Sequence, residues 1–196
     1  MKILVTGKGG QLASELAQVA SDKYQFITLS RQELNISDID QVQQIFKLHQ
    51  PDVVINAAAY TAVDKAETDV EKAYAVNEIG VKNLAITCKE SNTRLLHVST
   101  DFVFDGNKTT PYQTNDVTNP LGVYGASKLA GDNAVMEVLP SAVIVRTAWV
   151  YSAFGNNFVK TMLRLMAEKP ALGIVYDQVG TPTWAAGLAN RETNHG

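Results

Sequence analysis

The sequence predicts an α/β fold: a Rossmann-type doubly wound parallel sheet with helices on both faces. Short β-branched runs alternate with longer amphipathic stretches, and this alternation implies right-handed crossovers between parallel strands. The runs at residues 52–55 and 143–145 are almost entirely apolar, as is typical of strands buried on both faces. A glycine-rich turn, residues 7–10, directly follows the first apolar run, where dinucleotide-binding folds pass from strand to helix.

The predicted strands are short apolar segments bounded by glycine, proline or polar residues. They span residues 2–6, 25–29, 52–55, 94–98, 142–146 and 173–176. Ligands of open parallel sheets bind beyond the carboxyl ends of the strands, so we expect the chemistry in the loops that follow five positions. These positions are Thr6, Leu29, Ile55, Val98 and Thr147.

The predicted helices carry apolar residues at helical spacing. They span residues 11–21, 39–49, 70–90, 129–138 and 157–168. In the second helix the apolar positions include Ile39, Val42 and Phe46, and Asp38 is placed to cap its start. The polar residues 190–196 lack this periodicity, so we expect a frayed terminus there.

Composition narrows the class of protein. A chain of 196 residues, 45% hydrophobic and 19% charged, is long enough for one well-buried core. The net charge of -3 gives no reason to expect nucleic acid as a partner, and no apolar run is long enough to cross a membrane. The single cysteine, Cys88, suits a cytoplasmic protein. Three scattered histidines form no zinc-ligand pattern, so no metal site is expected from spacing.

The turn after the first strand has the spacing G-x-x-G-x-x-A, formed by Gly7, Gly10 and Ala13. Glycine lets the backbone turn tightly and approach a pyrophosphate closely, and the helix that follows points free N–H groups at it. The alternative is a plain glycine turn. Its place at the start of a βα series favours cofactor binding.

The second strand is followed by Ser30 and Arg31, where folds that prefer NAD often have an acid. A guanidinium here can pair with a 2′-phosphate, which favours NADPH over NADH. The alternative is a solvated surface arginine.

Tyr124 and Lys128 are four residues apart, which places them on one face of a helix. Carbonyl reduction requires a proton for the developing alkoxide, and a nearby ammonium lowers the pKa of a phenol. We expect Lys128 to lower the pKa of Tyr124, and the Thr100 hydroxyl to orient the substrate oxygen. The alternative is a surface pair on a helix.

Together these motifs resemble the extended short-chain dehydrogenase/reductase superfamily and, within it, the dTDP-4-dehydrorhamnose reductases. The most specific part of the resemblance is the run NAAAYTAVDKAE at residues 56–67. The other matching segments are residues 7–12, 99–106, 119–131, 146–151, 155–158 and 177–183.

The resemblance implies NADPH-dependent reduction of the 4-keto group of dTDP-4-dehydro-6-deoxy-L-mannose to dTDP-L-rhamnose, a precursor of cell-surface polysaccharide. Tyr124, Lys128 and Thr100 are the candidate catalytic residues, and the candidate substrate contacts are Thr100, Asp101 and Trp149. Core packing is the alternative role of Trp149. The candidate cofactor-binding residues are Gly7, Gly10, Gln11, Leu12, Ser30, Arg31, Asn35, Ile36, Ala57, Ala58, Ala59, Tyr60, Thr61, Tyr124 and Lys128.

Two features depart from the family pattern. Asn35 stands where the family usually has Asp. The family also continues beyond Pro182 into a smaller lobe, so we expect a C-terminally truncated form with most of that lobe absent and activity impaired. Residues 1–176 would form the NAD(P)-binding Rossmann domain, and residues 177–196 the start of the substrate lobe.

Further expectations rest on the resemblance alone. Glu15 matches a residue used by some members around Mg²⁺ at a dimer interface, so Mg²⁺ and a homodimer are candidates, although a solvated glutamate is the favoured interpretation. Two other functions stay open. One is a non-catalytic NADP-binding regulatory subunit, like that of methionine adenosyltransferase, and the other is a nucleotide-sugar epimerase or dehydratase.

Overall fold

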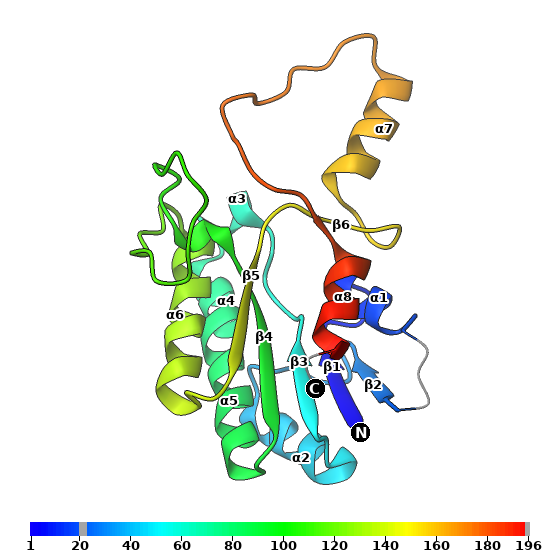
Figure 1. Cartoon of the computed structure of the whole chain (residues 1–196), viewed down its shortest axis with the longest axis vertical. Helices are drawn as coiled ribbons and strands as arrows, with labels where there is room; N and C mark the ends of the chain where they lie inside the picture. Colours follow the sequence, from blue (N-terminus) through cyan, green and yellow to red (C-terminus); the bar gives the residue numbers. More distant parts are fainter. Residues whose placement is uncertain (20–22, 195–196) are drawn as a thin grey trace.

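The computed structural model describes residues 1–19 and 23–194 and is built on a central parallel sheet (Figure 1). The sheet has the order β2-β1-β3-β4-β5. Its strands are β1 (Lys2–Thr6), β2 (Gln25–Leu29), β3 (Val53–Asn56), β4 (Arg94–Thr100) and β5 (Val143–Thr147). The predicted doubly wound fold is therefore confirmed, and each of these strands lies within two residues of its predicted position.

Helices connect the strands. They are α1 (Gln11–Leu16), α2 (Ile39–His49), α3 (Val63–Ala66), α4 (Val70–Tyr74), α5 (Val81–Glu90), α6 (Val123–Val138), α7 (Phe158–Glu168) and α8 (Ala185–Asn194). All but α3 and α7 contribute residues to the packing on the sheet or beside it. A π-helical segment, η1 (Ala75–Gly80), joins α4 to α5, and a 3₁₀ turn, η2 (Asp101–Val103), follows β4. A separate two-stranded pair is formed by β6 (Val150–Tyr151) and β7 (Thr183–Trp184).

The two faces of the sheet carry separate apolar cores, because alternate strand residues point to opposite sides. Leu4, Val54 and Leu95 pack with residues of α2, α5 and α6. Val5 and Ile55 pack on the other face with residues of α1 and α8. Figure 1 shows α1 and α8 together on this second side, with α7 projecting beyond the strand ends.

Strand β1 lies between β2 and β3. The chain leaves β1 toward one neighbour and returns on its other side, so the carboxyl ends of β1 and β3 form the switch point of the sheet. Ligands of doubly wound sheets bind at such a point. The loops after Thr6 and Asn56 meet there.

Three sequence predictions are corrected. The helix predicted at residues 11–21 ends at Leu16, with residues 20–21 outside the described part. Residues 173–176 form no strand, because no neighbouring strand pairs with this exposed apolar run. Residues 190–194 of the terminus expected to fray are helical, since the apolar residues Leu188 and Ala189 anchor α8 on α1, and residues 195–196 lie outside the described part.

Candidate active site

The turn after β1 admits only glycine at its first position. Gly7 has a φ of +83°, and a Cβ there would lie 2.8 Å from the carbonyl oxygen of Ala57. The N–H of Gly10 closes the turn on the Gly7 oxygen at 2.9 Å, while a Cβ on Gly9 would meet nothing within 4 Å. The turn is therefore tight on its inner side and bare on its outer side, which fits the pyrophosphate of a dinucleotide.

Gln11 begins α1, but its side chain is engaged within the protein. Its amide donates to the Val150 carbonyl at 3.1 Å and accepts from Asn157 at 3.0 Å. A phosphate at this helix start would therefore be held by backbone N–H groups rather than by the Gln11 side chain. Leu12, beside it, is buried in the core.

The end of β2 carries a small cluster of charges. The Glu33 carboxylate accepts from the Ser30 N–H at 2.8 Å and lies 3.4 Å from Lys8 Nζ. The hydrogen bonds from Ser30 lower the pKa of Glu33, and the Lys8 charge contributes. Arg31 is exposed at the same end. Lys8 and Arg31 thus offer two cations near the expected cofactor ribose, although the sequence argument considered only Arg31.

Residues 35 and 36 lie between β2 and α2. Asn35 accepts from the Ser37 N–H at 3.3 Å through its side chain, an interaction that shapes the turn. Ile36 is buried and packs closely on Gly80. A Cβ added to Gly80 would lie 2.6 Å from Cγ1 of Ile36. Both side chains therefore make contacts within the protein.

The segment after β3 is fixed by a residue that the sequence argument missed. Asn77, in η1, is fully buried and holds the backbone of Tyr60 at both ends, accepting from its N–H at 2.8 Å and donating to its carbonyl at 3.2 Å. Asn77 also donates to Ser127 of α6 at 3.0 Å. The residues Ala57 to Thr61 are thereby tied to the helix that carries the catalytic candidates. A lone asparagine in a helical run gave only a weak signal of this role.

Two glycines let α6 pack closely against η2 and η1. A Cβ on Gly125 would overlap the carbonyl oxygen of Phe102, and one on Gly131 would overlap that of Asn77. Since α6 touches backbone on both sides, its rotation is fixed. Tyr124 and Lys128 then face the carboxyl end of β4.

Tyr124 is half-buried, with its ring packed edge-on against Phe102 at a centroid distance of 5.5 Å. The Thr100 hydroxyl caps η2, accepting from the Phe102 N–H at 3.2 Å and donating to Asp101 at 3.3 Å. Burial raises the pKa of Tyr124, and the Asp101 carboxylate adds to this, while the Thr100 hydroxyl opposes it. Burial likewise raises the pKa of Asp101.

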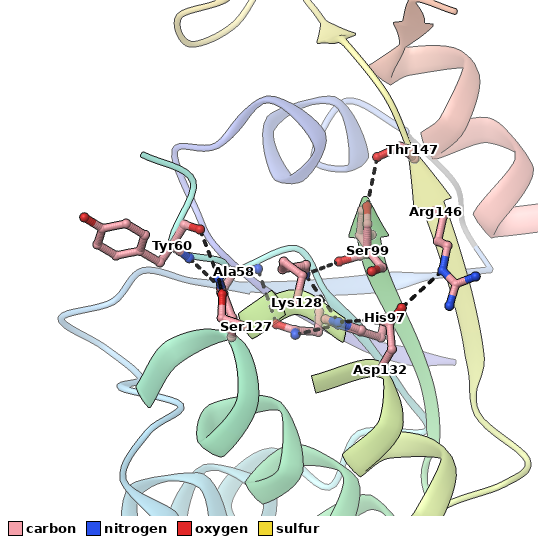
Figure 2. A network of polar contacts seen from close by, with 12 residues as sticks. Ala58, Tyr60, His97, Ser99, Ser127, Lys128, Asp132, Arg146 and Thr147 are labelled. Carbon is pink, nitrogen blue, oxygen red and sulfur yellow. Dashed lines mark hydrogen bonds and ion pairs between the residues drawn. The ribbon is translucent and has the colours of Figure 1, made fainter. Parts of the chain in front are cut away.

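Lys128 does not lower the pKa of Tyr124 as expected, because its amine points into the protein. Only 1% of its surface is exposed, and Nζ donates to the Val98 carbonyl at 2.7 Å and lies 3.3 Å from His97 Nε2 (Figure 2). Burial lowers the pKa of Lys128 to about 8, against an opposing effect of Asp132. The result is an amine whose charge changes close to neutral pH.

Trp149 follows β5 in a conformation that L-residues rarely adopt, with a φ of +47°. Its indole is 48% exposed and lies flush with Gly180, where a Cβ would come within 2.9 Å of the ring. Core packing therefore does not describe this residue. Strained backbone of this kind often marks functional positions.

Glu15 has a partner within the chain, because its carboxylate accepts from the Ser152 hydroxyl at 2.6 Å. Within residues 1–19 and 23–194, no three His, Cys, Asp or Glu side chains gather into a possible metal site. The structure therefore gives no support for Mg²⁺ at Glu15. In the same part of the chain, no helix has the length and hydropathy that a membrane span requires.

The geometry can now be compared with known proteins. The family model described as the RmlD substrate binding domain matches residues 1–194. A dTDP-4-dehydrorhamnose reductase of Aggregatibacter actinomycetemcomitans is 46% identical, and the match covers 96% of this chain and 65% of that protein. The spore coat polysaccharide biosynthesis protein SpsK of Bacillus subtilis is 42% identical, with 96% and 67% covered.

Solved structures agree with this relationship. A dTDP-4-dehydrorhamnose reductase of Clostridium acetobutylicum superimposes with a TM-score of 0.95 at 44% identity, covering 99% of this chain and 69% of that one. The enzyme of that name from Bacillus anthracis, solved in complex with NADP, has a TM-score of 0.95 at 38% identity, with the same coverage. The chain thus spans about two thirds of the length of these proteins.

Proposed function

The chain belongs to the RmlD substrate-binding domain family, and on that premise we propose that it carries the cofactor-binding and catalytic residues of an NADPH-dependent dTDP-4-dehydrorhamnose reductase. The reaction is reduction of the 4-keto group of dTDP-4-dehydro-6-deoxy-L-mannose to dTDP-L-rhamnose. The observation that carries this proposal is that Thr100 and Tyr124 lie together at the carboxyl end of β4, in the same parallel sheet whose β1 ends in the bare glycine turn. The NADP complex of the Bacillus anthracis relative supports the choice of cofactor.

Each residue of the site has a role in this reaction. NADPH, when bound, supplies the hydride. Tyr124 donates a proton to the alkoxide oxygen, and its raised pKa keeps the phenol protonated until that step. Thr100 hydrogen-bonds the same oxygen and fixes its position. Lys128 would supply positive charge to the remaining phenolate only in its protonated form and with Nζ turned from the Val98 carbonyl toward Tyr124. Asp101 and Trp149 lie at the edge of the site, where the sugar would bind.

Lys8 and Arg31 would hold the 2′-phosphate that distinguishes NADPH from NADH. In the variant Arg31→Asp, we expect the ratio of kcat/KM for NADPH to that for NADH to fall about tenfold or more, because one phosphate contact becomes a repulsion. Steady-state oxidation of both cofactors measures this ratio. An unchanged ratio would remove Arg31 from the cofactor site.

The 196 residues span 65% of the Aggregatibacter relative. Contacts with remote parts of a substrate normally contribute to its turnover as well as its binding. We therefore propose that these residues alone bind NADPH but turn over the dTDP sugar slowly. Oxidation of NADPH at the rate of a full-length relative would contradict this.

The variant Tyr124→Phe tests the catalytic assignment. Removing the phenolic proton should lower kcat by about 10²- to 10⁴-fold and leave the Kd for NADPH unchanged, as followed by nicotinamide absorbance and fluorescence. The matched control is Tyr112→Phe, since Tyr112 lies in the loop after η2 and stacks on Phe104. A regulatory subunit would bind NADPH without oxidising it in either form, and an epimerase would make product with no net loss of NADPH.

A further inference from the structure

Three polar side chains cross the sheet in one row below the catalytic edge. The strand register places Thr6 of β1 beside Asn56 of β3, and Asn56 beside His97 of β4. At most 2% of each residue is exposed. Thr6 donates to Asn56 at 2.6 Å, and Asn56 Nδ2 lies 3.0 Å from His97 Nδ1. This polar row ends at Lys128, and it begins one residue before the glycine turn.

The orientation of Asn56 is set by the donors around it. The Ala58 N–H points at both Thr6 Oγ1 and Asn56 Oδ1, at 3.2 and 3.3 Å. If the amide were reversed, its NH₂ group would face this N–H and leave two donors opposed. Oδ1 therefore faces Thr6 and Ala58, and the NH₂ group faces His97.

The orientation of Asn56 then selects the tautomer of His97. A ring nitrogen that faces an NH₂ group must accept, so Nδ1 carries no proton. Burial lowers the pKa of His97 well below its ordinary value, and the Lys128 charge adds to this, so the ring is neutral. A neutral ring must place its single proton on the other nitrogen, Nε2.

The Nε2–H group faces two side chains of α6. It lies 3.3 Å from Lys128 Nζ and 3.7 Å from Asp132 Oδ1. Oδ1 is one of the buried oxygens with no hydrogen-bond partner, while Oδ2 accepts from Arg146 Nε at 3.2 Å. The charged and titratable groups around the amine are thus His97 of β4, Asp132 of α6 and, behind Asp132, Arg146 of β5.

We propose that His97 is a positioning residue for Lys128, because its Nε2–H, fixed by Asn56, faces the amine and favours its uncharged form. This inference rests on the proposed reductase function. An uncharged amine can accept from Nε2–H while donating to the Val98 carbonyl, whereas an ammonium has no lone pair. Full accommodation of the ammonium requires the His97 proton to move to Nδ1, against the Asn56 amide. The polar row thereby links the charge of Lys128 to the strand that ends in the cofactor turn.

The tautomer can be observed directly in the unmodified protein. Long-range ¹H–¹⁵N spectra distinguish the two nitrogens of a neutral imidazole from each other and from an imidazolium. We expect a neutral His97 with its proton on Nε2 at pH 9, above the pKa of about 8 at which Lys128 loses its charge. A proton on Nδ1, or a charged ring, would overturn the proposal whether or not the protein reduces any substrate.

A pair of variants tests the effect on Lys128. Asn56→Asp keeps the acceptor for Thr6 and Ala58 but presents an acceptor to His97, so the His97 proton should move to Nδ1. With ¹³C-labelled lysine, and Lys128→Arg used to assign the signal, we expect the pKa of Lys128 to rise by about one unit or more. The same substitution in a His97→Leu background reports the effect of the added charge alone, and we expect less than half the shift there.

If Asn56→Asp shifted the pKa of Lys128 equally with His97 present and in the His97→Leu background, His97 would have no part in the effect of residue 56 on Lys128. The pH profile of kcat in Asn56→Asp tests whether this linkage affects the reaction. The pH at which kcat changes should shift by about as much as the pKa of Lys128. An unchanged pH profile of kcat in a variant whose Lys128 pKa has shifted would contradict a positioning role. Absence of NADPH oxidation in the unmodified protein, with NADPH bound, would instead contradict the proposed function and leave the His97–Lys128 linkage standing.

Discussion

Helices α6, with 16 residues, and α7, with 11, are held in opposite ways. On α6, Lys128, Asp132 and Val135 are buried among strands and other helices. On α7 no residue is buried, and Phe158, Leu163 and Met166 are each more than half exposed. Tyr124 and Lys128, the candidates for proton transfer, therefore lie on a helix that is packed into the protein, whereas α7 presents apolar surface. Most apolar residues of α6 are covered at least in part by the rest of the described chain, whereas most of those of α7 are exposed.

The largest difference in stability between the two segments should come from a substitution at Gly131, where α6 lies closest to another backbone segment. In Gly131→Ala, the new Cβ overlaps the Asn77 carbonyl, and we expect a loss of about 3 to 4 kcal/mol in the free energy of unfolding. Gly173→Ala is the control in the outer segment, because a Cβ there meets nothing within 4 Å. Its effect should stay within about 0.5 kcal/mol. Urea titrations measure both changes in unfolding free energy. Similar losses in the two variants would contradict the difference in packing between α6 and the segment that contains Gly173.

The burial of Lys128 should appear in the pH dependence of stability. Its pKa is lowered from 10.5 to about 8 in the folded chain, so between these values the unfolded chain binds more protons. The free energy of unfolding therefore increases as the pH rises from 8 to 10.5, by up to about 3 kcal/mol. Lys128→Met lacks this gain.

The measurement is the difference in unfolding free energy between the unmodified protein and Lys128→Met, at pH 7.5 and at pH 10.5. Other ionisable groups are common to both and cancel, apart from His97 and Asp132, which the Lys128 charge also affects. The unmodified protein should become more stable relative to the variant as the pH rises. A difference that is independent of pH would mean that Lys128 keeps an ordinary pKa.

The smallest predicted effect compares one apolar side chain from each helix. Val135→Ala on α6 removes fully buried methyl groups and should cost about 2 kcal/mol. Leu163→Ala on α7 changes a side chain that is 62% exposed and should cost less than about 0.5 kcal/mol. A loss at Leu163 as large as that at Val135 would show that the face of α7 is covered in solution.

The sequence predicted the parts of the fold that depend on local pattern. Alternating apolar runs located the five sheet strands, and the spacing of Tyr124 and Lys128 placed them on one helix face. The structure adds that Lys128 is turned toward His97, which depends on how β4 packs against α6. Nothing in the local sequence indicated that Gly131 lies against the backbone at Asn77.

The mistaken predictions have the same origin. Residues 173–176 have strand-like composition, but a strand also requires a partner, and none lies beside them. The end of the chain is polar in sequence, yet α8 forms because Leu188 packs in the core beside α1. In both places tertiary contact decided against the local pattern.

The central claim is that the residues at the end of β4 and on α6 reduce a dTDP-linked 4-keto sugar with NADPH. A single-turnover experiment tests it most directly: excess protein with NADPH bound is mixed with dTDP-4-dehydro-6-deoxy-L-mannose, and nicotinamide absorbance and sugar product are followed together. The account predicts loss of absorbance equal to the dTDP-L-rhamnose formed, even if turnover is slow. Bound NADPH that stays fully reduced on prolonged incubation, or product formed without its oxidation, would contradict it.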